Sequence, residues 1–99
     1  MANYCTNLFF ASTENEHDLN MIEKYLDEHF ESYMEMYDNS IDGEFGSRWS
    51  YPEETIDGMM KNVEEPDKLY IRVLSHELQG EYVSFRTFSN GKWNIHYKS

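Results

Sequence analysis

The feature that most constrains the fold is the Asn90-Gly91 pair near the end of the chain. It separates two runs of β-branched and aromatic residues, and it is the pair preferred in a two-residue type I′ hairpin turn. Such a turn places Phe88 opposite Trp93 and Arg86 opposite Ile95. A third run of the same kind precedes them across a short polar loop. We therefore predict a three-stranded antiparallel meander in the last third of the chain.

A second feature is the acidic stretch over residues 14–44, which contains eleven acidic residues and a single basic one. Its apolar residues recur every three or four positions from Leu19 to Tyr37, which is the spacing of one helical face. Thr13 and Glu16 fit a capping box at the start of this pattern. The stretch therefore predicts one long amphipathic helix that ends at about Tyr37.

Acidic side chains recur every four positions along this predicted helix and would form one stripe. Like charges at this spacing destabilise a helix by roughly 0.2–0.5 kcal/mol per pair. Successive carboxylates would lie about 6 Å apart, close to the spacing of successive phosphates in a nucleic-acid strand. The stripe is either a solvated helix face or a phosphate-like surface for a basic partner. Its predicted partner-binding residues are Glu23, Asp27, Glu31, Glu35, Asp38, Asp42 and Glu44.

The remaining patterns predict further strands and a second helix. Residues 4–11 and 41–49 have the apolar content and the alternation typical of strands. Ser50 and Pro52 mark the start of a shorter helix, with an apolar face that would include Ile56 and Met59. We expect one α+β domain over residues 1–99, ferredoxin-like in the broad sense. It would have a single antiparallel sheet of about five strands, with both helices packed on one face.

Charge and cysteine content narrow the class of function. The net charge is −11, and residues 1–66 hold sixteen acidic and three basic residues, whereas residues 67–99 hold three acidic and five basic residues. Such a charge repels nucleic acid and anionic membranes and speeds encounter with basic proteins. The single cysteine allows no intrachain disulfide, and no run of about 18 apolar residues occurs. These features favour a cytoplasmic protein that binds neither nucleic acid nor membrane directly.

The sequence lacks the patterns typical of catalytic and metal-binding sites, and this favours a protein that is not an enzyme. Cys5 lies at the start of a predicted strand, with no glycine-rich turn or helix N-terminus after it that would lower its pKa. We interpret it as a small buried side chain. The four histidines are His17, His29, His76 and His96. None of them stands in a zinc-binding spacing, and no phosphate-binding glycine loop occurs. We expect no catalytic residue, no metal ligand and no cofactor.

Two short motifs carry a family resemblance. The opening Met1-Ala2-Asn3-Tyr4-Cys5-Thr6-Asn7-Leu8 and the segment Gly46-Ser47-Arg48-Trp49 resemble the YubB-type ferredoxin-like domains of phages and plasmids. The chain differs from the usual family residues at Tyr4 and Phe45, where tryptophan is common. The resemblance implies a compact α+β sheet and an origin in a mobile element, and it implies no reaction.

Together, these features predict a small acidic inhibitor encoded by a phage or plasmid. Its partner would be a basic, nucleic-acid-binding host defence protein, either a CRISPR effector or a restriction enzyme, bound through the acidic helix. The alternative is an interaction or regulatory module that binds through the aromatic face of the C-terminal meander. That second interpretation depends on Tyr70, Arg72, Tyr82, Arg86 and His96.

Overall fold

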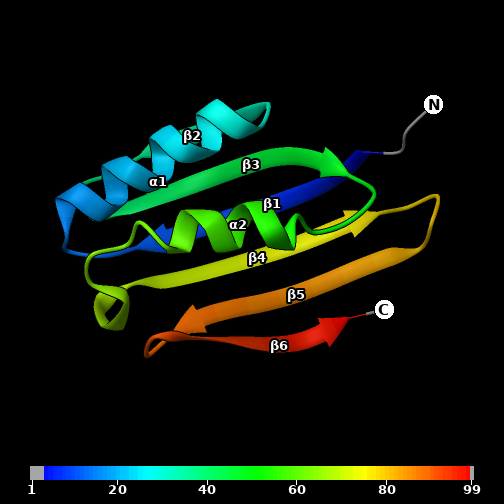
Figure 1. Cartoon of the computed structure of the whole chain (residues 1–99). Coiled ribbons are helices and arrows are strands. Elements are labelled where there is room, and N and C mark those ends of the chain that lie inside the picture. The colour runs from blue at the N-terminus through cyan, green and yellow to red at the C-terminus, as the bar shows by residue number, and fades with distance from the viewer. Residues whose placement is uncertain (1–3, 99) are drawn as a thin grey trace.

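The computed structural model describes residues 4–98, which form one antiparallel sheet and two α-helices (Figure 1). Along the chain these are β1 (Tyr4–Ser12), α1 (Glu16–His29), β2 (Ser32–Met36), β3 (Ser40–Arg48), α2 (Glu53–Met60), a 3-10 turn at Pro66–Lys68, β4 (Tyr70–Glu77), β5 (Tyr82–Ser89) and β6 (Lys92–Lys98). The sheet order is β2-β3-β1-β4-β5-β6, and every neighbouring pair is antiparallel. The predicted α+β class with a single antiparallel sheet is confirmed, with six strands among the described residues where about five were expected.

The predicted meander is confirmed down to its register. Phe88 pairs with Trp93 and Arg86 with Ile95. Asn90 and Gly91 have φ values of 53° and 78°, as the two central residues of a type I′ turn require. Beyond these pairs the ladder is interrupted between residues 85 and 86, so that the last residues of β6 shift by one position relative to β5.

The expected long helix is wrong in its second half, because α1 ends at His29. Phe30 is already extended, and its ring packs on Phe45 of β3 with 4.5 Å between ring centroids. The chain then turns back as the strand β2, which covers Ser32–Met36 and pairs antiparallel with β3. The expected capping box is also wrong, since the N-cap is Asn15, whose side chain accepts a hydrogen bond from the backbone N–H of Asp18 at 2.8 Å.

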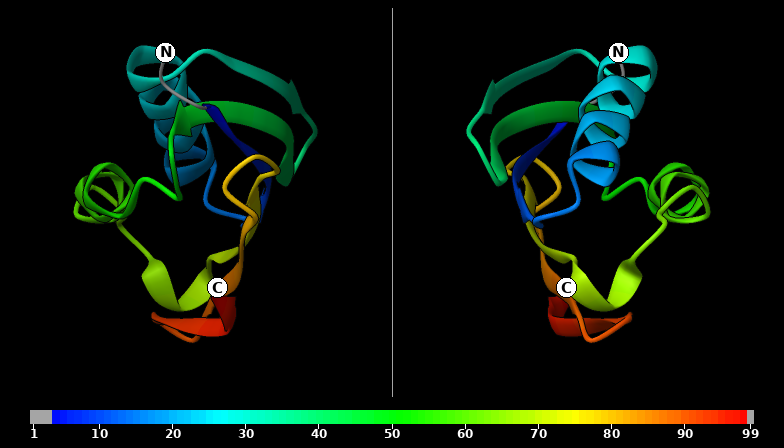
Figure 2. Two further views of the ribbon diagram at one scale, coloured as in Figure 1. Left: turned by 90° about the vertical axis from the view of Figure 1, so that its right-hand side faces the viewer. Right: turned by 90° about the vertical axis from the view of Figure 1, so that its left-hand side faces the viewer.

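Both helices cover the same face of the sheet and leave the other face open (Figure 2). The odd-numbered residues of β1 point toward the helices and are buried, among them Phe9. They meet the apolar faces of both helices, as expected for α2 from its sequence. The buried helical residues that build this core are Leu19, Ile22, Leu26, Ile56 and Met59.

Neither of the two α-helices in residues 4–98 is long and apolar enough to cross a membrane. The first three residues of the motif that resembles YubB-type domains, Met1 to Asn3, lie outside the described residues, as does Ser99 at the end of the expected domain.

Candidate protein-binding face

The candidate binding surface is the outer face, defined here as the side of the sheet opposite the two helices. On β1 the outer face carries the even-numbered residues, including Leu8 and Phe10. Leu8 is 43% exposed although it lies on a central strand. The cross-strand neighbours of these two residues on β3 and β4 are Glu44, Asp42, Leu74 and Arg72. The middle of the outer face therefore combines apolar, acidic and basic side chains.

One half of the outer face carries the acidic sheet patch, which consists of Glu35, Asp42 and Glu44. Glu35 of β2 lies directly opposite Asp42 of β3, and Glu44 lies opposite Tyr33. The Glu35 carboxylate accepts hydrogen bonds from the hydroxyls of Tyr33 at 3.4 Å and Tyr37 at 2.8 Å. The hydrogen bond from Tyr37 to Glu35, together with the nearby negative charges of Glu35 and Asp42, raises the pKa of the Tyr37 hydroxyl. Like charges directly opposite each other destabilise a sheet, so the patch has a local cost.

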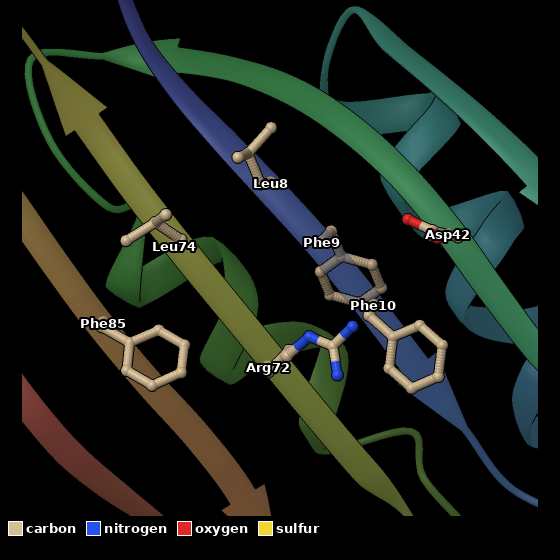
Figure 3. A pocket seen from close by; sticks show the side chains of 7 residues that line it. All are labelled: Leu8, Phe9, Phe10, Asp42, Arg72, Leu74 and Phe85. Atoms are coloured by element: carbon tan, nitrogen blue, oxygen red, sulfur yellow. The ribbon is translucent and has the colours of Figure 1, made fainter.

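An apolar hollow of about 360 Å³ adjoins the acidic sheet patch (Figure 3). Side chains from four neighbouring strands line it, and most of them project from the side of the sheet that faces away from the helices. The Arg72 guanidinium lies over the Phe10 ring, 4.4 Å from its centroid. The lining residues are Leu8, Phe9, Phe10, Asp42, Arg72, Leu74 and Phe85.

The other half of the outer face, formed by β4, β5 and β6, is rich in aromatic side chains. His96 of β6 bonds Thr87 through its Nε2 atom at 2.8 Å and packs against Phe85 at 5.2 Å between ring centroids. The shift in the β5–β6 ladder pairs Tyr97 with Phe85, which moves Tyr97 to the outer face, where it is 57% exposed. Across the face, charge changes from acidic at β2–β3 to weakly basic at Arg72 and Lys92, which the strand register places on this side.

The seven predicted partner-binding residues do not form the single stripe that the helical pattern predicts. Glu23 and Asp27 lie on α1, on the helix-covered side of the molecule, while Glu31 follows the helix and Asp38 lies in the β2–β3 turn. The other three form the acidic sheet patch on the opposite side. Glu31 lies close to that patch, because it lines a shallow hollow of about 370 Å³ together with Glu44.

The five residues of the alternative interpretation are also divided between the two faces. Tyr70, Arg72 and His96 belong to the outer face by their register. Arg86 is only 5% exposed and lies beneath α2, where it stacks on Tyr51 and pairs with Glu53 at 3.4 Å. Tyr82 lies on this same inner side and accepts a hydrogen bond from the backbone N–H of residue 51. Tyr82 and Arg86 therefore support the fold beneath α2.

The sequence interpretation missed the apolar residues at the centre of the outer face. Their signal is the continuous run Leu8-Phe9-Phe10-Ala11, which places large side chains on both sides of β1. An alternating pattern would have indicated one apolar face and one polar face. A strand that is apolar on both sides, in a sheet with helices on only one side, must present apolar surface on the other.

Cys5 lies on the helix side of β1 in a buried polar cluster. Burial raises the pKa of its thiol, so it is protonated at neutral pH and is a weak nucleophile. Next to it, the Asn7 side chain donates to Ser47 Oγ at 2.9 Å and accepts from Ser75 Oγ at 2.6 Å. These bonds join β3, β1 and β4 beneath the helices, and the cluster therefore has a structural role.

Comparison with known proteins finds no family model, no curated protein and no solved structure that matches the chain. The resemblance to YubB-type domains therefore stays a prediction.

Proposed function

We propose that this protein is a small non-catalytic inhibitor that binds a basic protein partner through the outer face of its sheet. The observation that carries the proposal is the acidic sheet patch beside an exposed apolar hollow. Carboxylates select a basic partner and steer its approach, while an apolar pocket supplies the desolvated contact that provides affinity. This surface replaces the acidic helix face on which the sequence interpretation was based.

The cost of the patch supports a role in binding. Glu35 and Asp42 repel each other across a strand pair, and the tyrosine hydroxyls hold the Glu35 carboxylate in place. Lysine or arginine side chains of a partner would relieve this repulsion on binding. A net charge of −11 adds long-range attraction for any basic protein.

A nucleic-acid-binding protein is the partner class that we favour. Asp42 and Glu44 lie two residues apart on one face of β3, which separates their carboxylates by about 7 Å. A basic groove that binds successive phosphates could accept these carboxylates instead. A CRISPR effector or a restriction enzyme in the cytoplasm of a host cell is the specific candidate, and this choice depends on the resemblance to phage and plasmid domains.

The proposal is tested by two matched charge reversals. The first changes Glu35, Asp42 and Glu44 to Lys on the sheet, and the second changes Glu23, Asp27 and Glu28 to Lys on α1. Each would be titrated against a CRISPR effector and a restriction enzyme that hold a fluorescent DNA duplex, with duplex displacement as the signal. We expect wild type to displace the duplex and the sheet variant to be weaker by about 100-fold, because rows of like charges would then face each other.

The helix variant is expected to stay within about threefold of wild type, since its charges lie on the other side of the molecule. Circular dichroism would verify that both variants fold. Displacement that survives the sheet reversal, or that only the helix reversal abolishes, contradicts the proposed binding face. Failure of wild type to displace duplex from either of the two proteins contradicts the proposed partner class.

A second candidate function uses the other half of the outer face. Tyr97 and Phe85 pair across β5 and β6, and the exposure of Tyr97 favours a partner contact that does not depend on the acidic sheet patch. In that case Tyr97→Ala would weaken binding, whereas reversal of the acidic sheet patch would not. The same displacement assay, repeated with the Tyr97 variant, separates the two functions.

A further inference from the structure

Three potential metal ligands converge where α1 begins. His17 Nδ1 lies 3.3 Å from Glu64 Oε1 and 3.8 Å from Asp18 Oδ1. The ligand atoms of His17, Asp18 and Glu64 all lie within 4.8 Å of one another. Glu64 is far from the other two in sequence and reaches them from the segment that follows α2. Sequence spacing alone therefore gives no sign of this cluster.

Asp18 is the fixed member of the cluster. Its carboxylate is fully buried, and each oxygen accepts one backbone hydrogen bond, from the N–H of Glu64 at 2.8 Å and of Glu65 at 3.0 Å. Each carboxylate oxygen has two lone pairs, so Oδ1 keeps one for a cation. Hydrogen bonds of this kind orient metal-binding carboxylates in proteins. Asn15 adds a second brace, because its amide donates to Glu65 at 2.7 Å.

The other two members can adjust to a metal ion. The side chains of His17 and Glu64 are 64% and 55% exposed, so neither is held by packing. Ligands at about 2.0–2.1 Å from a tetrahedral zinc ion lie about 3.3 Å from each other. The pair His17 Nδ1 and Glu64 Oε1 already has this separation. His17 Nδ1 lies 3.8 Å from Asp18 Oδ1, and the Asp18 and Glu64 ligand atoms lie within 4.8 Å of each other, so the exposed His17 and Glu64 side chains would move toward the fixed Asp18 carboxylate on binding.

We propose that His17, Asp18 and Glu64 form a site for a divalent transition-metal ion, with zinc as the ion that fits best. One imidazole nitrogen and two carboxylate oxygens suit zinc and its neighbours in the first transition row. Magnesium and calcium prefer all-oxygen sites, so the imidazole disfavours them. A water molecule would complete the tetrahedron. The surrounding protein, with a net charge of −11, attracts a cation.

The bound ion would act as a clip between two parts of the fold. It would join the first turn of α1 to the segment between α2 and β4, which backbone hydrogen bonds to Asp18 already hold. Because the unfolded chain does not bring His17 and Glu64 together, the ion would stabilise the folded state by mass action. The site is separate from the outer face and does not depend on the proposed inhibitor function.

The test is calorimetric titration of the full chain with zinc chloride, followed by thermal unfolding with zinc and with EDTA. We expect one ion per chain, a raised melting temperature, and reversal by EDTA. His17→Gln and Glu64→Gln should each weaken zinc affinity by about tenfold or more, because each removes one ligand. His29→Gln is the matched control, since His29 is an exposed histidine on the same helix that bonds the backbone carbonyl of Tyr25.

The control should keep the affinity of wild type within about twofold, because His29 is not a ligand. Three results would overturn the assignment. The first is no saturable zinc binding by wild type, and the second is a zinc affinity of the His17 and Glu64 variants equal to that of wild type. The third is magnesium binding as tight as zinc binding in a parallel titration. A cluster that is only a histidine–carboxylate ion pair gives the first result.

Discussion

Gly43 is a residue of β3 that leaves no room for a side chain beside β2. A Cβ atom added there would lie 2.1 Å from the Tyr33 carbonyl oxygen and 2.9 Å from the Met34 Cα. Both contacts are with backbone atoms of β2, which cannot rotate away as a side chain would. Among the described residues 4–98, the nearest neighbour of a Cβ at Gly46, three residues further along the same strand, is the Tyr4 ring at 3.9 Å. The sequence shows two glycines in one strand, and only the packing distinguishes them.

Gly43→Ala is expected to lower the free energy of unfolding by about 1–3 kcal/mol, because β2 must move away from β3. Gly46→Ala should change it by less than about 1 kcal/mol, and in the stabilising direction, since alanine restricts the unfolded chain. Urea unfolding followed by circular dichroism measures both. Equal effects at the two positions would show that β2 does not lie where the structure places it.

At the level of elements, the region from Thr13 to Met36 holds a helix and a strand where its periodicity predicts one helix. The apolar and aromatic residues at positions 26, 30, 33 and 37 satisfy the helical spacing, whereas Met34 and Met36, with Glu35 between them, fit the alternation of a strand. Local pattern cannot choose between these two. The strand is selected by tertiary contacts. The backbone of β3 pairs with β2 along its whole length, and the Phe30 ring packs against Phe45 of β3.

The start of α1 depends on Asn15 and can be tested there. Asn15→Ala should lower the free energy of unfolding by about 1 kcal/mol, because the N–H of Asp18 loses its cap. Asn20→Ala, on an exposed position of the same helix, is the matched control. It should change stability by less than about 0.5 kcal/mol, in the stabilising direction, since alanine has the higher helix propensity. Measured in EDTA, a loss at Asn20 equal to that at Asn15 would refute the cap assignment.

At the level of the whole molecule, acidic residues lie on both sides of the sheet. The helices carry one set and the acidic sheet patch carries the other, so negative charge lies on both sides of the sheet. Self-repulsion of this kind destabilises the compact state and weakens as salt screens it. The predicted charge imbalance therefore has a consequence for stability as well as for partner choice.

Neutralising the acidic sheet patch should stabilise the protein while it removes partner binding. Glu35→Gln and Asp42→Asn should each raise the free energy of unfolding by about 0.2–1 kcal/mol at low salt, since the two face each other across β2 and β3. Glu54→Gln is a control of opposite sign, because Glu54 lies in the first turn of α2, where the helix dipole favours an acid. Unfolding in low and high NaCl measures these effects, and a gain that persists at high salt would contradict an electrostatic origin.

The sequence by itself determined the α+β class, the single antiparallel sheet, the strand pairing around Asn90-Gly91 and the apolar face of α2. These follow from short-range physics, namely turn geometry and the repeat of side chains along one element. The tertiary structure alone decided that residues 32–36 form a strand, that Arg86 is buried, and that Glu35, Asp42 and Glu44 meet on the outer face. Each of these depends on which strands and helices become neighbours, and that is set by long-range packing.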